Sequence, residues 1–133
     1  MNFEGDLSLL QRKMAASSAG VQRRQAVMEA LNVRSGQSIL DLGCGGGHLV
    51  EELARAVGPH GKAFGLDPSK TQIQAARERC NHFDQATFFC CMADEIALNA
   101  ASCDAVASIQ TLEYIEDVDA ALSAVIPLLK TRS

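Results

Sequence analysis

Residues 39–47 read ILDLGCGGG, and this stretch decides the fold of the chain. The apolar start, Ile39 to Leu42, is typical of a buried β-strand, and the glycines that follow are typical of a tight turn. A helical pattern of apolar residues begins directly after the turn. A buried strand that passes through glycines into a helix is the usual form of a cofactor-binding junction in an α/β sheet. We therefore predict a parallel α/β fold with its ligand site at this turn.

The spacing of the glycines argues against a dinucleotide ligand. The dinucleotide fingerprint G-x-G-x-x-G needs its third glycine so that the helix can pack closely against the strand. Counting from Gly43 places His48 at that position, and counting from Gly45 places Val50 there. The G-x-x-x-x-G-K-[ST] pattern of a nucleotide triphosphate site is absent as well. The pattern that the chain has is D-x-G-x-G-x-G, formed by Asp41, Gly43, Gly45 and Gly47.

Glycines at alternate positions remove the β-carbons from one side of the turn, so that the backbone can approach a flat or extended ligand. The next acidic residue, Asp67, follows a second predicted strand and lies 20 residues after Gly47. An acid at this place can accept hydrogen bonds from both hydroxyls of a ribose. Its alternative role is to cap the helix that follows, and the two roles are compatible.

The periodicity of the remaining sequence predicts alternating strands and helices. Strands are predicted at Ser38–Leu42, Lys62–Leu66, Ala86–Cys91 and Asp104–Ser108. Helices are predicted at Asp6–Met14, Val21–Leu31, Gly47–Val57, Lys70–Cys80 and Val118–Leu129, with residues 17–20 as an interruption between the first two. Ser69 and Gln72 have the spacing of a capping box, and Pro127 is expected to loosen the last helix. Such alternation favours parallel strands joined by right-handed crossovers.

The composition is that of one soluble globular domain of 133 residues, 47% hydrophobic and 21% charged. No apolar run is long enough to span a bilayer and the sequence starts without a signal-peptide core, so we expect a cytoplasmic protein that has no membrane partner. The net charge of −4 makes nucleic acid an unlikely main partner. The five cysteines lack metal-type spacing, so no metal site is expected and they are interpreted as reduced, mostly buried thiols.

The region from Val33 to Lys130 resembles the class I S-adenosylmethionine-dependent methyltransferases. Residues 41–47 are similar to the first motif of this family, and residues 62–67 to its second strand with the terminal acid. Residues 102–108 are similar to the fourth strand, and residues 110–117 to the segment after it. The ubiquinone/menaquinone and arsenite methyltransferases are the most similar members, and in the latter cysteines hold arsenic, which is the alternative role for the thiols here. The resemblance divides the chain into an N-terminal helical segment, residues 1–32, and a Rossmann-like S-adenosylmethionine-binding domain, residues 33–133.

This resemblance implies S-adenosylmethionine as the cofactor. Asp67 would bind the ribose, and Asp41 would face the ammonium of the methionine part, directly or through water; its alternative role is that of a hydrogen-bonded loop acid. The amides of Gly45 and Gly47, at the start of the next helix, would meet the methionine carboxylate and the ribose. The predicted cofactor-binding residues are Asp41, Gly43, Cys44, Gly45, Gly47, Asp67, Pro68, Met92, Ala93, Asp94 and Gln110.

The predicted adenine side departs from the pattern of the family. The family places an acid and then a small residue after the third strand, whereas here Met92 occupies the place of the acid and is followed by Ala93 and Asp94. We expect Met92 to pack on the adenine face, Ala93 to offer a backbone amide, and Asp94 to accept a hydrogen bond from the adenine amine.

The acceptor side is predicted from the segment after the fourth strand. Gln110 would approach the methionine part of the cofactor, or alternatively stand in solvent at the strand end. Glu113 and Tyr114 are candidates for a general base or a substrate anchor. Because the cofactor already carries an activated methyl group, methyl transfer depends mostly on alignment and on exclusion of water, and no obligatory nucleophile is expected.

The family sheet has seven strands in the order 3-2-1-4-5-7-6, and this chain has sequence for about four of them, in the order 3-2-1-4. Strands five to seven are expected to be missing, so the fourth strand becomes an edge with unpaired backbone groups, which we expect a homodimer to cover. The chain is interpreted as an S-adenosylmethionine-dependent methyltransferase for a small-molecule acceptor. The alternative is a truncated S-adenosylmethionine-binding module without independent catalysis, completed by a partner or a dimer.

Overall fold

Four parallel strands form the centre of the computed structural model, which describes residues 18–108 and 123–130. The strands are β1 (Ser38–Leu42), β2 (Lys62–Leu66), β3 (Ala86–Phe89) and β4 (Ala105–Ala107). They lie in the order β3-β2-β1-β4, and each neighbouring pair is parallel, which confirms the predicted sheet. The register places Asp41 of β1 between Gly65 of β2 and Ala107 of β4. The first predicted site residue therefore lies in the middle of the sheet.

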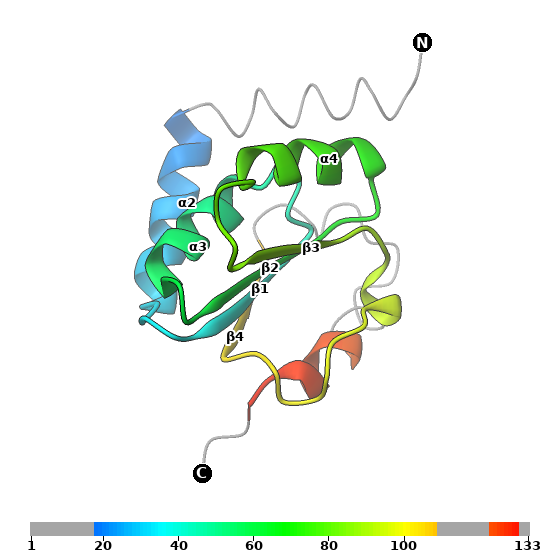
Figure 1. The fold of residues 1–133 in the computed structure, drawn as a ribbon. Coiled ribbons are helices and arrows are strands. Elements are labelled where there is room, and N and C mark those ends of the chain that lie inside the picture. The colour runs from blue at the N-terminus through cyan, green and yellow to red at the C-terminus, as the bar shows by residue number, and fades with distance from the viewer. Residues whose placement is uncertain (1–17, 109–122, 131–133) are drawn as a thin grey trace.

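Three helices cover one face of this sheet (Figure 1). They are α2 (Ser18–Leu31), α3 (His48–Val57) and α4 (Lys70–Arg79). The apolar residues of α3 recur at helical spacing and are all buried, which is why this segment is a helix on the core: Leu49, Val50, Leu53, Ala54 and Val57. An ion pair of 3.6 Å between Arg24 and Glu52 joins α2 to α3. Among the described residues, no helix combines the length and the apolar character that crossing a bilayer requires.

The opposite face is covered by irregular chain and by two short 3₁₀ helices, η1 (Ala93–Glu95) and η3 (Ile126–Leu128). Their buried residues form a second core with the strand residues that point to this side, among them Leu40, Leu42 and Leu66. All five cysteines are free thiols, and three are buried: Cys44, Cys80 and Cys103. A parallel sheet buried on both faces accounts for the continuous apolar character of β1.

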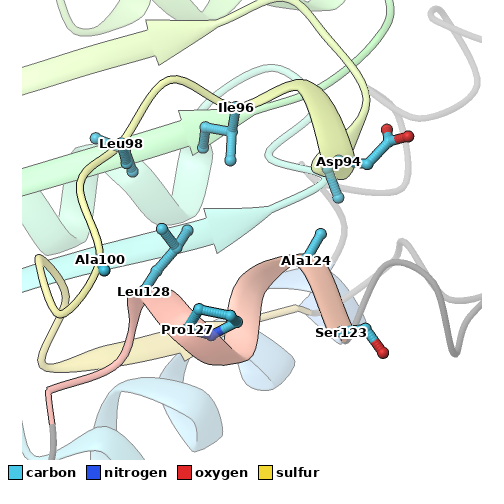
Figure 2. A pocket seen from close by; sticks show the side chains of 9 residues that line it. Asp94, Ile96, Leu98, Ala100, Ser123, Ala124, Pro127 and Leu128 are labelled. Carbon is cyan, nitrogen blue, oxygen red and sulfur yellow. The ribbon is translucent and has the colours of Figure 1, made fainter.

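An apolar groove of about 570 Å³ lies between the β3-to-β4 connection and η3 (Figure 2). Ile96 and Leu98 of the connection lie on one side of this groove, and Pro127 and Leu128 of η3 on the other. None of its lining residues belongs to the glycine turn, so the groove and the turn are separate features.

Several predicted bounds differ from those of the structure. Residues 18–20 belong to α2 and do not interrupt it, because the buried Gly20 packs into the molecule despite the low helix propensity of glycine. β3 ends at Phe89, two residues earlier than predicted, and the Phe89 carbonyl accepts a bond of 3.1 Å from the Asp67 amide. β4 is one residue shorter at each end than predicted. Of the helix predicted at 118–129, residues 118–122 lie outside the described residues, and the described part is helical at 123–125 and passes into η3, which contains Pro127. The helix predicted at 6–14 also lies outside the described residues.

β4 lies at the edge of the sheet that the structure describes. The amide of Cys103 donates to the carbonyl of Leu128, and the amide of Lys130 donates to the carbonyl of Cys103, both at 2.8 Å. These bonds form an isolated parallel bridge between Cys103 and Leu129. The start of β4 is therefore covered, whereas residues 105–107 have β1 as their one neighbouring strand among the described residues.

Candidate cofactor site

The chain leaves β1 through a turn in which Gly43, Gly45 and Gly47 have φ angles of +75°, +53° and +84°. Residues with a side chain disfavour this left-handed region, so the backbone itself requires the glycine pattern. The amides of Gly43 and Cys44 both donate to the carbonyl of Leu66, at 2.7 and 2.9 Å. The turn is thereby fastened to the end of β2, and the two strand ends meet at one site.

Asp67 follows β2 directly and connects the turn to α4. Its Oδ2 accepts a hydrogen bond from the amide of Gly45 at 3.1 Å, and its Oδ1 accepts one from the amide of Ser69 at 2.9 Å. Ser69 is the N-cap of α4, with its hydroxyl accepting from the amide of Gln72 at 3.3 Å. Half of the predicted capping box is therefore present, but the N-cap amide is bound by Asp67 and not by the Gln72 side chain. A carboxylate offers about four acceptor positions, so these bonds are compatible with further contacts to ribose hydroxyls.

Asp41, the last residue but one of β1, is 3% exposed. Its Oδ1 is buried without a hydrogen-bond partner among the described residues. Burial, followed by the nearby charge of Asp67, raises the pKa of Asp41 from 3.8 to about 8. Buried polar atoms in native proteins nearly always have partners, so an exception requires an explanation such as a missing ligand or water. A cationic ligand group beside Asp41 would supply both the partner and the compensating charge.

The opposite side of the turn is held by α4, a role that the sequence did not reveal. A Cβ added at Gly47 would lie 2.9 Å from the Cβ of Ala76 and 3.0 Å from its Cα. Nε of Arg79 donates to the carbonyl of Gly46 at 3.2 Å, and the thiol of Cys80 contacts the carbonyl of Gly47 at 3.7 Å. The close approach of α4 is therefore what excludes a side chain at position 47, and the space there is not open to a ligand.

Gln72 is a second residue of α4 whose place beside the turn could not be predicted from the sequence. Its side chain is 1% exposed and lies against the turn: its Nε2 would be 4.0 Å from a Cβ added at Gly45, and its Oε1 3.7 Å from one added at Gly46. Among the described residues, nothing else lies within 4 Å of a Cβ at Gly45, so the turn has room beside this glycine. Because Gln72 lies three positions after Ser69, it was interpreted as a capping residue. No feature of the sequence indicated that its side chain is buried.

The amides of Gly45 and Gly47, expected to meet the ligand, donate within the protein in this structure. Gly45 donates to Asp67, and Gly47 donates to the carbonyl of Cys44 at 3.1 Å. The Cys44 side chain points beneath the turn, where its Sγ would be 2.9 Å from a Cβ added at Gly65. The buried thiol therefore packs on β2, and the part of Cys44 that faces the turn is its backbone.

The residues predicted for adenine follow β3 at the same end of the sheet. Met92 is 47% exposed, Asp94 is exposed, and Ala93 is buried in the second core. The amide of Met92 is bound by Oε1 of Glu95 at 3.0 Å, which orders this segment. Asp94 also borders the apolar groove (Figure 2).

The segment after β2 is tied to the end of β3, because the carbonyl of Pro68 accepts a contact of 3.6 Å from the thiol of Cys90. Ser108, directly after β4, carries a buried hydroxyl oxygen without a hydrogen-bond partner among the described residues. No role was predicted for Ser108, since a single serine at a strand end carries no signal. Gln110, Glu113 and Tyr114 lie outside the described residues.

Comparison with known proteins identifies the class to which this fold and site belong. A family model described as "Methyltransferase domain" matches residues 39–132. The chain therefore belongs to this methyltransferase-domain family.

Individual relatives extend the comparison. An uncharacterized 37.1 kDa protein in a Streptomyces fradiae transposon is 30% identical over 111 residues, which are 84% of this chain and 32% of that protein. A ubiquinone biosynthesis O-methyltransferase of Rhodopseudomonas palustris is 31% identical over 102 residues, 77% of this chain and 39% of that enzyme. The crystal structure of a SAM-dependent methyltransferase from Aquifex aeolicus has a TM-score of 0.74 at 20% identity, covering 80% of this chain and 58% of that one. The structural likeness shows the fold, and the chain spans 32% and 39% of the lengths of these two curated relatives.

Proposed function

We propose that the chain binds S-adenosylmethionine at the glycine turn between β1 and β2 and transfers its methyl group to a small-molecule acceptor. The observation that carries this proposal is the placement of two carboxyl groups, Asp41 and Asp67, beside a turn whose glycines fit no phosphate-binding pattern. Membership of the methyltransferase-domain family supports the reaction. The relative named for ubiquinone biosynthesis supports a small molecule as the acceptor.

The electrostatics of the turn favour a cationic ligand over a dinucleotide. S-adenosylmethionine carries a sulfonium and an ammonium besides its carboxylate, whereas a dinucleotide would bring an anionic pyrophosphate to the glycine turn, next to the buried carboxyl group of Asp41. A buried charge is stable when an opposite charge pairs with it, and an unpaired or like-charged arrangement is costly. The unpartnered Oδ1 of Asp41 fits the ammonium, and the room beside Gly45 fits the close approach of an extended ligand.

The residues of the chain would bind and align the cofactor, which itself supplies the activated methyl group. Asp67 would accept hydrogen bonds from the ribose hydroxyls while it holds Gly45. The exposed side chain of Met92 would cover one face of the adenine. Gln110 stays a proposal for the methionine part of the cofactor. Glu113 and Tyr114 stay as proposals for the acceptor side, where alignment and exclusion of water provide most of the rate enhancement.

Titration calorimetry with S-adenosylmethionine, S-adenosylhomocysteine and NAD tests the cofactor. We expect saturable binding of the first two ligands and none of NAD; binding of NAD alone would contradict the proposal. Transfer of a labelled methyl group is then measured with a panel of phenols and hydroquinones and, in a separate reaction, with ribosomal RNA. Label in RNA and in none of the small molecules would overturn the proposed acceptor class while leaving the cofactor in place.

The second candidate is a cofactor-binding domain that needs a second copy of the chain for activity. It is favoured by the outer edge of β4, where residues 105–107 have no second strand beside them among the described residues. Light scattering during size-exclusion chromatography distinguishes the two candidates. A dimer that binds the cofactor supports this candidate, and a monodisperse monomer with methyltransferase activity contradicts it.

A further inference from the structure

We propose that Asp41 is a neutral acid in the ligand-free protein and that it ionises, with release of one proton, when a cationic ligand enters the site. The second half of this statement rests on the function proposed above. The first half concerns the protein alone, so that it can be tested without any ligand.

The surroundings of Asp41 do not stabilise a negative charge. The side chain lies in the middle of the sheet at 3% exposure, and its register neighbours, Gly65 and Ala107, bring no polar side chain to it. Its Oδ1 has no hydrogen-bond partner among the described residues. A carboxylate that loses most of its hydration, with one oxygen left buried and without a hydrogen bond, is destabilised relative to the protonated acid.

The titratable groups near Asp41 add to this effect. Asp67, which follows β2, places a second carboxyl group at the same turn. The thiol of Cys44, within the turn, is the other titratable group nearby. Burial above all raises the pKa of Cys44 well above its ordinary value, so this thiol brings no charge to Asp41. Among the described residues of α3, α4 and β4, no lysine, arginine or histidine offsets the rise in the pKa of Asp41 to about 8. The charge of a second carboxyl group at the same turn makes ionisation of Asp41 less favourable.

Ligand binding changes this balance through a simple proton transfer. The carboxyl O–H bond of Asp41 breaks, the proton passes to the buffer, and the electron pair stays on the carboxylate. The negative charge formed in this way pairs with the positive charge that the ligand brings. The site is therefore charged when it is occupied and close to neutral at Asp41 when it is empty.

The first experiment measures the unfolding of the ligand-free protein by urea between pH 5 and pH 8. An acid whose pKa is raised by folding binds more protons in the folded state, so stability falls as the pH rises through this window. We expect the folded-to-unfolded ratio of the wild type to fall by up to about tenfold per pH unit relative to Asp41→Asn. Asp84→Asn, which makes the same change at an exposed position, is the matched control and should keep the wild-type slope.

The second experiment measures S-adenosylmethionine binding by calorimetry at pH 6.5 in phosphate and in imidazole, whose ionisation enthalpies differ. We expect the wild type to release about one more proton than Asp41→Asn, because ionisation of the ligand's own amino group is common to both proteins. S-adenosylhomocysteine gives the same comparison with a ligand that has no sulfonium.

The outcomes separate the two proposals. Parallel stability profiles of the wild type and Asp41→Asn would overturn the inference, because Asp41 would then be ionised in the empty protein. A difference in slope without any S-adenosylmethionine binding would support the neutral acid and overturn the proposed function together with the coupled proton release. Equal proton release by both proteins would overturn the coupling even if the ligand binds.

Discussion

Substitution of Gly47 by alanine should destabilise the protein by about 2–5 kcal/mol, and the structure separates this loss into two parts. A residue with a side chain at φ +84° costs about 1–2 kcal/mol. The added methyl group would lie 2.9 Å from the Cβ of Ala76 and 3.0 Å from its Cα, and overpacking of this kind costs about 1–3 kcal/mol. Against a total stability of about 5–15 kcal/mol, the expected loss is large but measurable.

The matched control is Gly36→Ala. Gly36 has a φ angle of +88°, and an added Cβ would meet nothing within 4 Å, so this variant carries the conformational cost alone. Urea unfolding of both variants should therefore differ by about 1–3 kcal/mol, the steric part at Gly47. In a double-mutant cycle, Ala76→Gly should cost less stability in the Gly47→Ala background than in the wild type, because it removes the shorter contact. Equal losses in the two single variants would refute the argument that α4 excludes a side chain from the turn.

Three further predictions concern the surroundings of the turn. Asp67→Ala should weaken S-adenosylmethionine binding by about 1.5–3 kcal/mol, roughly 10- to 150-fold, and unchanged affinity in calorimetry would remove Asp67 from the site. Gly65→Ala should lower the free energy of unfolding by about 1–3 kcal/mol, and the urea midpoint with it, because its Cβ would lie 2.7 Å from the ring of Phe88; a wild-type midpoint would contradict this packing. Burial, followed by the charges of Arg79 and Arg24, lowers the pKa of His48 to about 4. The folded state then binds fewer protons than the unfolded state, so stability should fall as the pH drops from 6.5 towards 4, and His48→Gln should flatten this part of the profile.

The sheet could be predicted because its signals are local. The apolar run before Gly43 and the alternation of strands with helices fix parallel strands, and a glycine turn after β1 fixes where the site lies. Strand order followed from the family resemblance. The ends of the elements could not be predicted as well, because they depend on tertiary contacts: the last backbone bond of β3 is formed at Phe89, and Gly20 is helical because it is buried.

The site was predicted in part for the same reason. Asp41 and Asp67 could be singled out because the first lies near the end of a recognisable strand and the second follows one, but the bonds of Asp67 to Gly45 and Ser69 depend on how two strand ends meet. The contact between Ala76 and Gly47 joins positions 29 residues apart, and no local pattern encodes it. The role of Gln72 was misread because its spacing from Ser69 is equally typical of a helix cap.

The glycine turn is anchored from both sides before any ligand arrives, by Leu66 and Asp67 on one and by α4 on the other. Ligand binding then does not have to order this backbone, because its conformational entropy was already lost during folding. The glycine turn is preorganised by residues that lie far from it in the sequence. A synthetic peptide of residues 39–47 would carry every glycine of the pattern and still lack the shape that they serve.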